Sequence, residues 1–295
     1  MAAETTVSTI AGRINNSYLS DVMLDYAIDA AVIGQFMRVE NLAGKGTNIA
    51  RFGKTVKDTA GAITEGTAMS NTALDATATS VTAAEVGILR NPTKLAMRSA
   101  AMSEDEFVAW VVEDGTKLCI EKFETDLAAR FASASNSVGV TTTAFTLAQF
   151  AAGVSRLGIS KAKGRAVFIG SGKQAADIRD ALMSTTATVF ASGQANNILQ
   201  KTGDDGYVGN LMGTDFWQTN LCPLANADAD RVGCFLIDAA AKPENAAIGV
   251  ALLWMPELEQ VNDPALTGRK MSVSMAYGEG EVEDFNYVKA VSRKE

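Results

Sequence analysis

The sequence predicts an α+β protein that combines extended segments with one long helix and one α/β unit. Three observations support this prediction. Residues 51–101 are rich in Thr, Ala and Gly, residues from about 102 to 135 keep a helical period without proline, and residues 140–255 alternate between strand-like and helix-like patterns. The chain has 295 residues, of which 47% are hydrophobic and 20% charged, so it can bury a substantial core.

Residues 1–50 are expected to form an arm. Asp21, Asp25 and Asp29 recur at every fourth position with an apolar stripe between them. This spacing predicts one short amphipathic helix behind a flexible start. The stripe needs a partner, which is either the protein's own core or a neighbouring chain.

Residues 51–101 contain few large side chains, especially between Gly53 and Val81. Thr-rich stretches interrupted by Gly61 and Gly66 are typical of strands and turns. We therefore expect a long, thin β-hairpin whose return strand covers residues 80–90. A two-stranded hairpin with so little apolar surface is marginal alone and should lie on another element. The alternative is a disordered loop, although long loops without secondary structure are uncommon.

Residues 102–139 carry the clearest helical signal. Ser103 and Glu106 have the spacing of a capping box. Every fourth residue forms one largely apolar face, which consists of Val111, Gly115, Cys119, Phe123, Leu127 and Phe131. Opposite charges stand four residues apart on other faces, in the pairs Glu113/Lys117, Lys117/Glu121 and Asp126/Arg130. We expect one helix of about 30 residues, about 45 Å long, on the surface of a layer.

The remaining chain divides into an α/β part, residues 140–255, and a strand-rich tail, residues 256–295. The tail holds two alternating segments that we interpret as a pair of strands with one apolar face. In order, the expected elements are a helix capped by Thr146, a strand at 166–169, a helix at 171–182, strands near 211–218, 232–238 and 247–253, and tail strands at 271–277 and 285–291.

The chain contains no histidine, which removes the commonest general base and metal ligand. Ser-His-Asp and Cys-His catalysis and His-ligated zinc are thereby excluded, so an enzyme is disfavoured. With 26 basic and 34 acidic residues the net charge is -8. A protein that grips nucleic acid usually has a basic surplus, so any contact with a genome should be weak and non-specific.

Cysteine usage and the chain start predict a protein made in the cytoplasm. Cys119, Cys222 and Cys234 have no CxxC spacing and are expected to be buried free thiols in a reducing compartment. The first residues lack the pattern of a signal peptide. The most apolar run, residues 246–255, is too short to span a bilayer.

Residues 170–173 (Gly-Ser-Gly-Lys) lie between a predicted strand and a predicted helix, where a phosphate loop would lie. Val167 and Gln174 replace the Gly and the Ser or Thr which that motif requires. We therefore expect an ordinary turn with a solvated Lys173 and no bound nucleotide.

Other candidate chemistry also has a simpler interpretation. The acidic groups, Asp204 with Asp205 and residues 279–284, do not match a calcium loop and are expected to be solvated turns. Lys161, Lys163 and Arg165 are expected to form a solvated basic turn. Trp110, Trp217 and Trp254 are expected in a core or an interface rather than in a stacking platform for bases. We expect no catalytic residue, metal or cofactor.

Three segments resemble a known family: NPTKLAMRSAAMSEDEF at 91–107, GRAVFIGSGKQAADIRDAL at 164–182 and GYVGNLMGTDFWQTNLCP at 206–223. Together with the order of elements, they resemble the major capsid protein of tailed bacteriophages, with the Hong Kong 97-type capsid fold. The resemblance covers nearly the whole chain. It implies an N-terminal arm at 1–50, an extended hairpin (the E-loop) at 51–101, a peripheral domain with a spine helix at 102–139, an axial α/β domain at 140–255 and return strands to the peripheral domain at 256–295.

The resemblance implies a structural protein of the virion that assembles with copies of itself, as hexamers and pentamers, into the icosahedral shell enclosing a phage genome. Implied partners are a portal protein, separate scaffolding and decoration proteins where these exist, and packaged double-stranded DNA, with no membrane. Neither catalysis nor a cofactor is implied. The alternatives are an encapsulin-type compartment shell of the same fold and, with less support, an α/β enzyme.

Charge patterning suggests where subunits meet. The predicted hairpin carries a basic stretch with few acids, whereas acids concentrate at the start of the long helix and near the C-terminus. We expect the hairpin's basic base to meet an acidic edge of an adjacent subunit, through contacts that set register more than strength. The candidate interface residues are Arg38, Arg51, Lys54, Lys57, Arg90, Lys94, Arg98, Glu104, Glu106, Glu279, Glu281 and Glu283.

Overall fold

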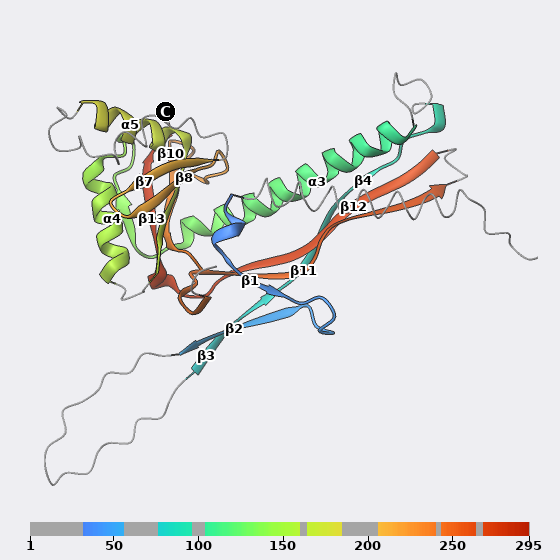
Figure 1. Ribbon diagram of the computed structural model, residues 1–295, viewed down its shortest axis with the longest axis horizontal. Helices are drawn as coiled ribbons and strands as arrows, with labels where there is room; N and C mark the ends of the chain where they lie inside the picture. Colours follow the sequence, from blue (N-terminus) through green and yellow to red (C-terminus); the bar gives the residue numbers. More distant parts are fainter. Residues whose placement is uncertain are drawn as a thin grey trace, which may run out of the picture.

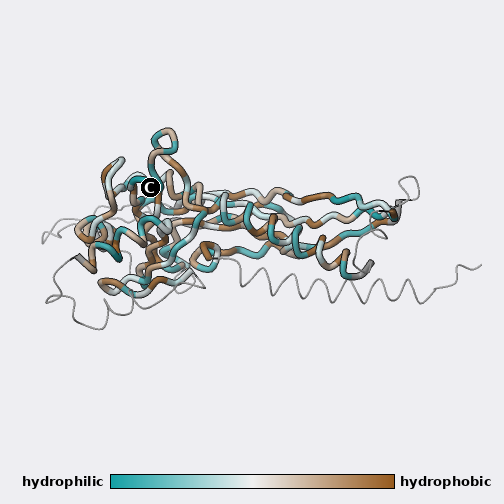
Figure 2. Tube along the Cα trace, turned by 90° about the horizontal axis from the view of Figure 1, so that it is seen from above, coloured by the Kyte–Doolittle hydropathy of each residue, from teal (hydrophilic) through white to brown (hydrophobic). Residues whose placement is uncertain are grey.

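The computed structural model describes residues 32–55, 76–95, 104–159, 164–184, 206–239, 243–263 and 268–294. The helix expected near the start of the chain, the tip of the expected hairpin and the expected cap Ser103 lie outside these residues. The described part has a compact unit at one end, a long extension and a projecting two-stranded hairpin (Figure 1). The extension is also thin in the perpendicular view (Figure 2). Within the described ranges, no helix is long and apolar enough to cross a membrane.

The long helix α3 (Glu104–Ala129, 26 residues) runs along the extension and ends in a 3-10 turn, η2 (Arg130–Ser133). The expected single helix is confirmed, and all six residues of its expected face are buried. Gly115 lets the helix approach the sheet closely, because a Cβ there would lie 2.7 Å from Cγ2 of Val273. The expected pair between Glu113 and Lys117 forms, with 2.5 Å between Oε1 and Nζ.

The ion pair expected between Asp126 and Arg130 is wrong. Asp126 pairs with Lys122 instead, with 2.5 Å between Oδ1 and Nζ. Arg130 pairs with Glu279, with 3.0 Å between Nη2 and Oε1. The reason is that Arg130 begins the 3-10 turn, whose tighter winding changes the side-chain spacing that an α-helix would give.

A four-stranded sheet packs one face against α3. Alternate residues of its third strand, from Met271 to Tyr277, belong to the buried core beneath the helix. The positions between them point to the opposite side, which we call the outer face. In spatial order the strands are β1 (Arg38–Asn41), β11 (Ile248–Asp263), β12 (Gly268–Glu281) and β4 (Ala84–Arg90); β1 runs parallel to β11 and the other pairs are antiparallel.

The compact unit contains a seven-stranded sheet of order β5-β13-β10-β6-β8-β7, with β9 beside β10. Helices α4 (Leu147–Ile159) and α5 (Gly172–Ser184) pack with it around five phenylalanines: Phe145, Phe150, Phe168, Phe216 and Phe235. The strands are β5 (Ser137–Gly139), β6 (Ala166–Gly170), β7 (Tyr207–Leu211), β8 (Thr214–Gln218), β9 (Leu224–Ala225), β10 (Asp230–Ile237) and β13 (Tyr287–Arg293). Short 3-10 turns lie at η1 (Gly34–Phe36), η3 (Pro243–Asn245) and η5 (Asp284–Asn286).

The helices of this unit begin as the sequence predicted. Thr146 caps α4 in a capping box with Gln149: the Gln149 N–H donates to Oγ1 of Thr146 at 3.3 Å, and the Thr146 N–H donates to Oε1 of Gln149 at 2.9 Å.

The strand expected at 211–218 is in fact two strands, because Met212 and Gly213 both adopt positive φ, 53° and 77°, and reverse the chain. Two successive residues of this kind form the tight turn that suits a β-hairpin.

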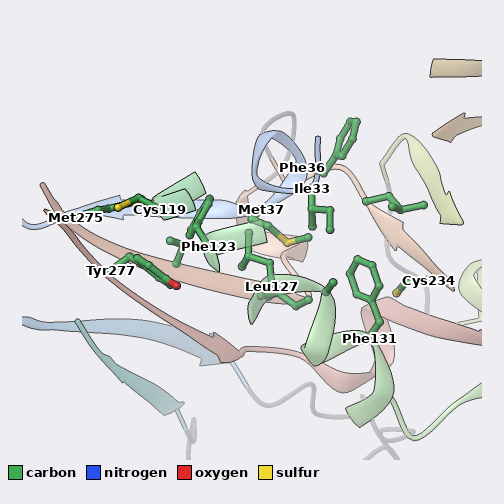
Figure 3. Close-up of a cluster of buried hydrophobic side chains, with 14 of the residues drawn as sticks. Ile33, Phe36, Met37, Cys119, Phe123, Leu127, Phe131, Cys234, Met275 and Tyr277 are labelled. Atoms are coloured by element: carbon green, nitrogen blue, oxygen red, sulfur yellow. The ribbon is translucent and has the colours of Figure 1, made fainter. Parts of the chain in front are cut away.

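One hydrophobic core joins the two sheets (Figure 3). It includes Leu127 and Phe131 at the end of α3, Cys234 of β10, and Ile33, Phe36 and Met37. Residues 32–50, expected in an arm, therefore begin with three core side chains and continue into β1. The three cysteines are free and buried as expected, and burial raises the pKa of the Cys222 thiol to about 12.

The two tail strands do not pair with each other, so that prediction is wrong. β12 lies between β11 and β4 in the four-stranded sheet, whereas β13 lies between β10 and β5 in the seven-stranded sheet. The 3-10 turn η5 separates them and directs the chain into the other sheet. The expected boundary between residues 255 and 256 falls within β11, which is continuous from Ile248 to Asp263.

Candidate assembly surfaces

A two-stranded hairpin projects from the outer face of the four-stranded sheet (Figure 1). Its strands β2 (Ile49–Thr55) and β3 (Ala76–Thr82) pair antiparallel from Ile49 with Thr82 to Thr55 with Ala76. A hairpin is thus present, but the return strand expected at 80–90 is wrong: the hairpin strand ends at Thr82, and residues 84–90 form β4, which pairs with β12 in the four-stranded sheet. After Ala83 the chain continues directly as β4, so the hairpin is joined to the sheet at its base.

The base of the hairpin rests on a floor of glycines, which we call the glycine seat: Gly249, Gly278 and Gly280. A Cβ at Gly249 would lie 2.8 Å from the ring of Phe52, and one at Gly280 would lie 2.5 Å from Cγ2 of Val81. Gly249 and Gly280 are direct cross-strand partners, so they form one continuous notch across β11 and β12. Side chains in this notch would exclude the hairpin.

Phe52 is the main apolar anchor in this seat. It is fully buried, in a small core with Ala50, Val81 and Ala251. The Arg38 guanidinium carbon lies 5.2 Å from the centroid of its ring, within the range of a cation–π contact. The hairpin therefore has a fixed base, despite the small apolar surface that its sequence offers.

The structure separates the basic residues that the sequence grouped together. Arg51 is exposed on β2, but Arg38 lies over Phe52 within the subunit. Arg90 pairs with Asp114 of α3, with 2.8 Å between Nη2 and Oδ2. Lys94 is exposed just after β4. The side chain of Lys54 and all of Lys57 and Arg98 lie outside the described residues.

The acidic residues near the C-terminus are mostly engaged inside the subunit. Glu279 pairs with Arg130. Oε2 of Glu281 accepts a hydrogen bond of 2.8 Å from the Tyr287 hydroxyl, whose pKa is raised by burial and by this carboxylate. Glu283 is only partly exposed and also interacts within the subunit. At the helix start, Glu106 is exposed, and the side chain of Glu104 lies outside the described residues.

A different acidic surface, which sequence reasoning missed, lies on the outer face. Glu257 and Glu259 on β11 and Glu85 on β4 are exposed there. Their cross-strand partners are Ser274, Ser272 and Ala276 on β12, which alternate with the residues under α3. Leu89 and Val261 on the same face are 56% and 64% exposed. The alternating segment Glu-Leu-Glu at 257–259 was the available signal, because it places both acids on one side of a strand.

The residues that resembled a phosphate loop cap the start of α5 instead. Oε1 of Gln174 accepts from the Ser171 N–H at 3.0 Å, and Oγ of Ser171 accepts from the Gln174 N–H at 3.2 Å. Gln174, which breaks the nucleotide motif, therefore completes the capping box with Ser171 at the start of α5. Lys173 is not the solvated lysine that we expected, because it forms an ion pair with buried Asp177, with 2.7 Å between Nζ and Oδ1.

Nothing in the described residues favours a metal or a stacking site. They hold no group of three or more metal-ligating side chains, and Asp204 and Asp205 lie outside them. Arg165 pairs with Asp215, while Lys161 and Lys163 fall in an undescribed stretch. Trp217 packs against Phe36 in the shared core, with 5.4 Å between their ring centroids. Trp254 is partly buried, and Trp110 is 54% exposed on α3.

This arrangement of a long helix on a thin sheet, a projecting hairpin and a compact α/β unit has the fold of chains from several bacteriophage capsids. The chain resembles one from Mycobacterium phage Che8 at 15% identity, over 88% of this chain and 90% of that one, with a TM-score of 0.67. It resembles the capsid of Cyanophage P-SCSP1u at 13% identity, over 90% and 89%, with a TM-score of 0.66. A virus-like particle from Pyrococcus furiosus matches at 10% identity, over 92% and 97%, with a TM-score of 0.59. Neither a protein-family model nor a curated protein matches the sequence.

Proposed function

We propose that this protein is the major capsid protein of a tailed bacteriophage, which assembles with copies of itself into the icosahedral shell around the genome. The observation that carries the proposal is the near-complete coverage in both directions against phage capsid chains. The projecting hairpin supports it, because an extended element held by a rigid base can reach a neighbouring molecule. The role is structural and needs no catalysis or cofactor.

We assign the segments of the chain to parts of a capsid subunit as follows from the fold. Residues 1–50 are the arm, and residues 51–101 are the E-loop that reaches a neighbour. Residues 102–139, with the returning strands of 256–295, form the peripheral domain around the spine helix α3. Residues 140–247 form the axial domain near the centre of each hexamer or pentamer, because β11, which begins at Ile248, lies in the four-stranded sheet beside α3. Because β13 lies in the seven-stranded sheet, the last residues belong with the axial domain instead.

The proposed partners are other copies of the chain, a portal protein at one vertex, and scaffolding and decoration proteins where the phage has them. Packaged DNA would touch the shell weakly, since the net charge of -8 repels phosphate. The mature location is the virion, after synthesis in the host cytoplasm.

The test is electron microscopy of the purified full-length protein, expressed alone and with the neighbouring phage genes. We expect closed shells or hexamers and pentamers. A strictly monomeric protein in light scattering, at all concentrations and with any scaffold supplied, would refute the proposal. Particles that hold a protein cargo, without DNA or a portal vertex, would favour the encapsulin-type alternative.

We further propose that the basic strand of the hairpin, which begins with β2, meets the acidic outer face of an adjacent subunit. Arg51 is exposed, and Lys54 and Lys57 follow it in the sequence. Glu85, Glu257 and Glu259 are the opposite charges exposed on the outer face, whereas Glu279 and Glu281 already have partners. Each exposed pair contributes about 0–1 kcal/mol and is screened by salt, so the contact gains weight through repetition over the shell.

Replacing Glu257 and Glu259 by Lys should raise the protein concentration needed for assembly severalfold at low salt. The added changes Arg51→Glu, Lys54→Glu and Lys57→Glu should partly restore assembly, because the charges are then exchanged. Light scattering across salt concentrations measures both effects. Glu121→Lys, which changes another exposed acid, on α3, is the control and should leave assembly unchanged. Equal behaviour of Glu257/Glu259 and Glu121 variants would show that the outer-face acids are merely solvated.

A further inference from the structure

Glu124 of α3 is a carboxylate buried in the core, with 2% of its surface exposed. Its Oε2 accepts a hydrogen bond of 2.7 Å from the Ile33 N–H, and its Oε1 accepts one of 2.9 Å from the Gly34 N–H. These N–H groups start the 3-10 turn η1, where the first donors have no partner within the turn. Glu124 therefore caps this turn from 91 residues away in the sequence.

Residues 32–37, which we call the strap, are held to three parts of the molecule at once. Glu124 fixes the strap to α3, and Phe36 packs edge-on against Trp217 of β8. The Ala239 N–H, just after β10, donates to the Phe36 carbonyl at 3.1 Å. Gly34 permits the close fit, since a Cβ there would lie 2.9 Å from the Phe123 ring. The strap is thus fixed at once to α3, to β8 and to the end of β10.

The anchor depends on a carboxylate whose charge is poorly compensated. The strap itself contains no ionisable side chain. Burial raises the pKa of Glu124 above its ordinary value near 4.5, and the backbone N–H groups of residues 32–34 oppose this only in part. The ionisable side chains on the surrounding elements, which are Lys122 and Asp126 on α3, Tyr277 and Glu279 on β12, and Asp238 after β10, do not contribute to this shift.

We infer that Glu124 and the strap form a proton-dependent latch, which holds residues 32–37 against the long helix. In the latched state the carboxyl is buried, and in the released state it is in water with an ordinary pKa. The latched state therefore binds a proton more tightly, so acid favours latching and rising pH favours release. Between the ordinary and the raised pKa, the opening constant should rise by up to about tenfold per pH unit, and it should level off above that window.

The inference does not rest on the proposed function, because the latch lies within one subunit. It predicts that residues 32–37 are held more firmly in mildly acidic solution than in neutral solution. If the subunit builds a shell, this would make the attachment of the arm responsive to pH before or during assembly.

The experiment is amide hydrogen exchange of the full-length protein between about pH 4 and about pH 8, with each rate divided by its intrinsic value at that pH. Protection at Ile33 and Gly34 should fall as the pH rises through the window. In Glu124→Gln, which keeps one acceptor oxygen but cannot titrate, protection should no longer depend on pH. Glu121→Gln, which changes an exposed acid one turn earlier on α3, should behave like the original protein.

A second measurement covers the case in which Glu124→Gln does not fold. Carbon-13 NMR of the glutamate side chains of the unaltered protein should give Glu124 a pKa above 4.5. A Glu124 pKa at or below that value would overturn the inference. The same conclusion follows if protection at Ile33 and Gly34 is indifferent to pH, or if Glu124→Gln shows the pH dependence of the original protein.

Discussion

A chain in which residues 56–75 are replaced by an Asn-Gly turn is expected to fold normally and to form no closed shells. The replacement keeps every described pair of β2 and β3, from Ile49 with Thr82 to Thr55 with Ala76. It also keeps Phe52 and Val81, the two side chains that hold the base of the hairpin in the glycine seat. Asn-Gly is the two-residue turn that best suits an antiparallel pair of strands.

The free energy of unfolding should change by less than about 1 kcal/mol, because loop length alters stability only weakly. Thermal unfolding followed by circular dichroism measures this. Electron microscopy measures assembly, which should fail because the proposed reach to a neighbour is lost. The matched control replaces residues 56–75 by a Gly/Ser linker of equal length. This control chain should fold equally well. If the contact with a neighbour depends on the sequence of residues 56–75, the control should also fail to assemble. If the contact depends only on the length of the loop, the control should assemble.

An outcome in which the shortened chain unfolds would show that residues 56–75 belong to the core of the subunit. Normal shells from the shortened chain would show that the hairpin does not make the proposed contact. The two failures are distinguishable, because the first appears in the circular dichroism of the isolated protein and the second only in the particles.

The elements that the sequence predicted well are those with local signals. The face from Val111 to Phe131 repeats every fourth residue, and the charged residues Glu113, Lys117 and Glu121 between its members break the period of two that a strand would need, so the pattern indicates a helix. The starts of α4 and α5 were equally local, since Thr146 and Ser171 each find their capping partner three residues later.

Strand partners could not be predicted in the same way. The alternation in residues 271–277 and 285–291 indicates strands, but alternation does not say which strand lies alongside. β12 pairs with β11 and β4, and β13 pairs with β10 and β5, so each choice depends on segments distant in the sequence. The short turn η5 between them does not reverse the chain into a hairpin.

The two most informative sites were hidden for a related reason. Glu124 lies within Glu-Lys-Phe-Glu-Thr-Asp, which suggests an exposed helical face, and only its bonds to the N–H groups of Ile33 and Gly34 explain its burial. In the glycine seat, Gly249 and Gly280 contact a hairpin some 170 to 230 residues earlier in the sequence. A single sequence contains no signal that would predict a contact between segments so far apart. Charge counting grouped basic residues that the structure separates, and it chose the acids Glu279 and Glu281, which are engaged within the subunit.

Gly278→Ala is expected to displace the hairpin and so to disable assembly with a moderate loss of stability. A Cβ at this position would lie 2.1 Å from the backbone oxygen of Thr82 and 3.2 Å from Cα of Ala83. These are backbone atoms at the point where β3 leads into β4, so no side-chain rotation can relieve the overlap. Overpacking of this kind typically costs about 1–3 kcal/mol, which the subunit can reduce by moving the hairpin off its seat.

The measurement combines thermal unfolding with hydrogen exchange of the amides in β2 and β3, which should lose protection selectively while α3 and the seven-stranded sheet keep theirs. Electron microscopy should show few or no closed shells. Gly53→Ala is the matched control, because it adds the same methyl group to an exposed position of β2 with nothing within 4 Å. It should change stability by no more than about 0.5 kcal/mol and leave assembly intact. If Gly278→Ala matched Gly53→Ala in exchange and assembly, the glycine seat would not set the position of the hairpin, and the rigid reach proposed for this protein would need another source.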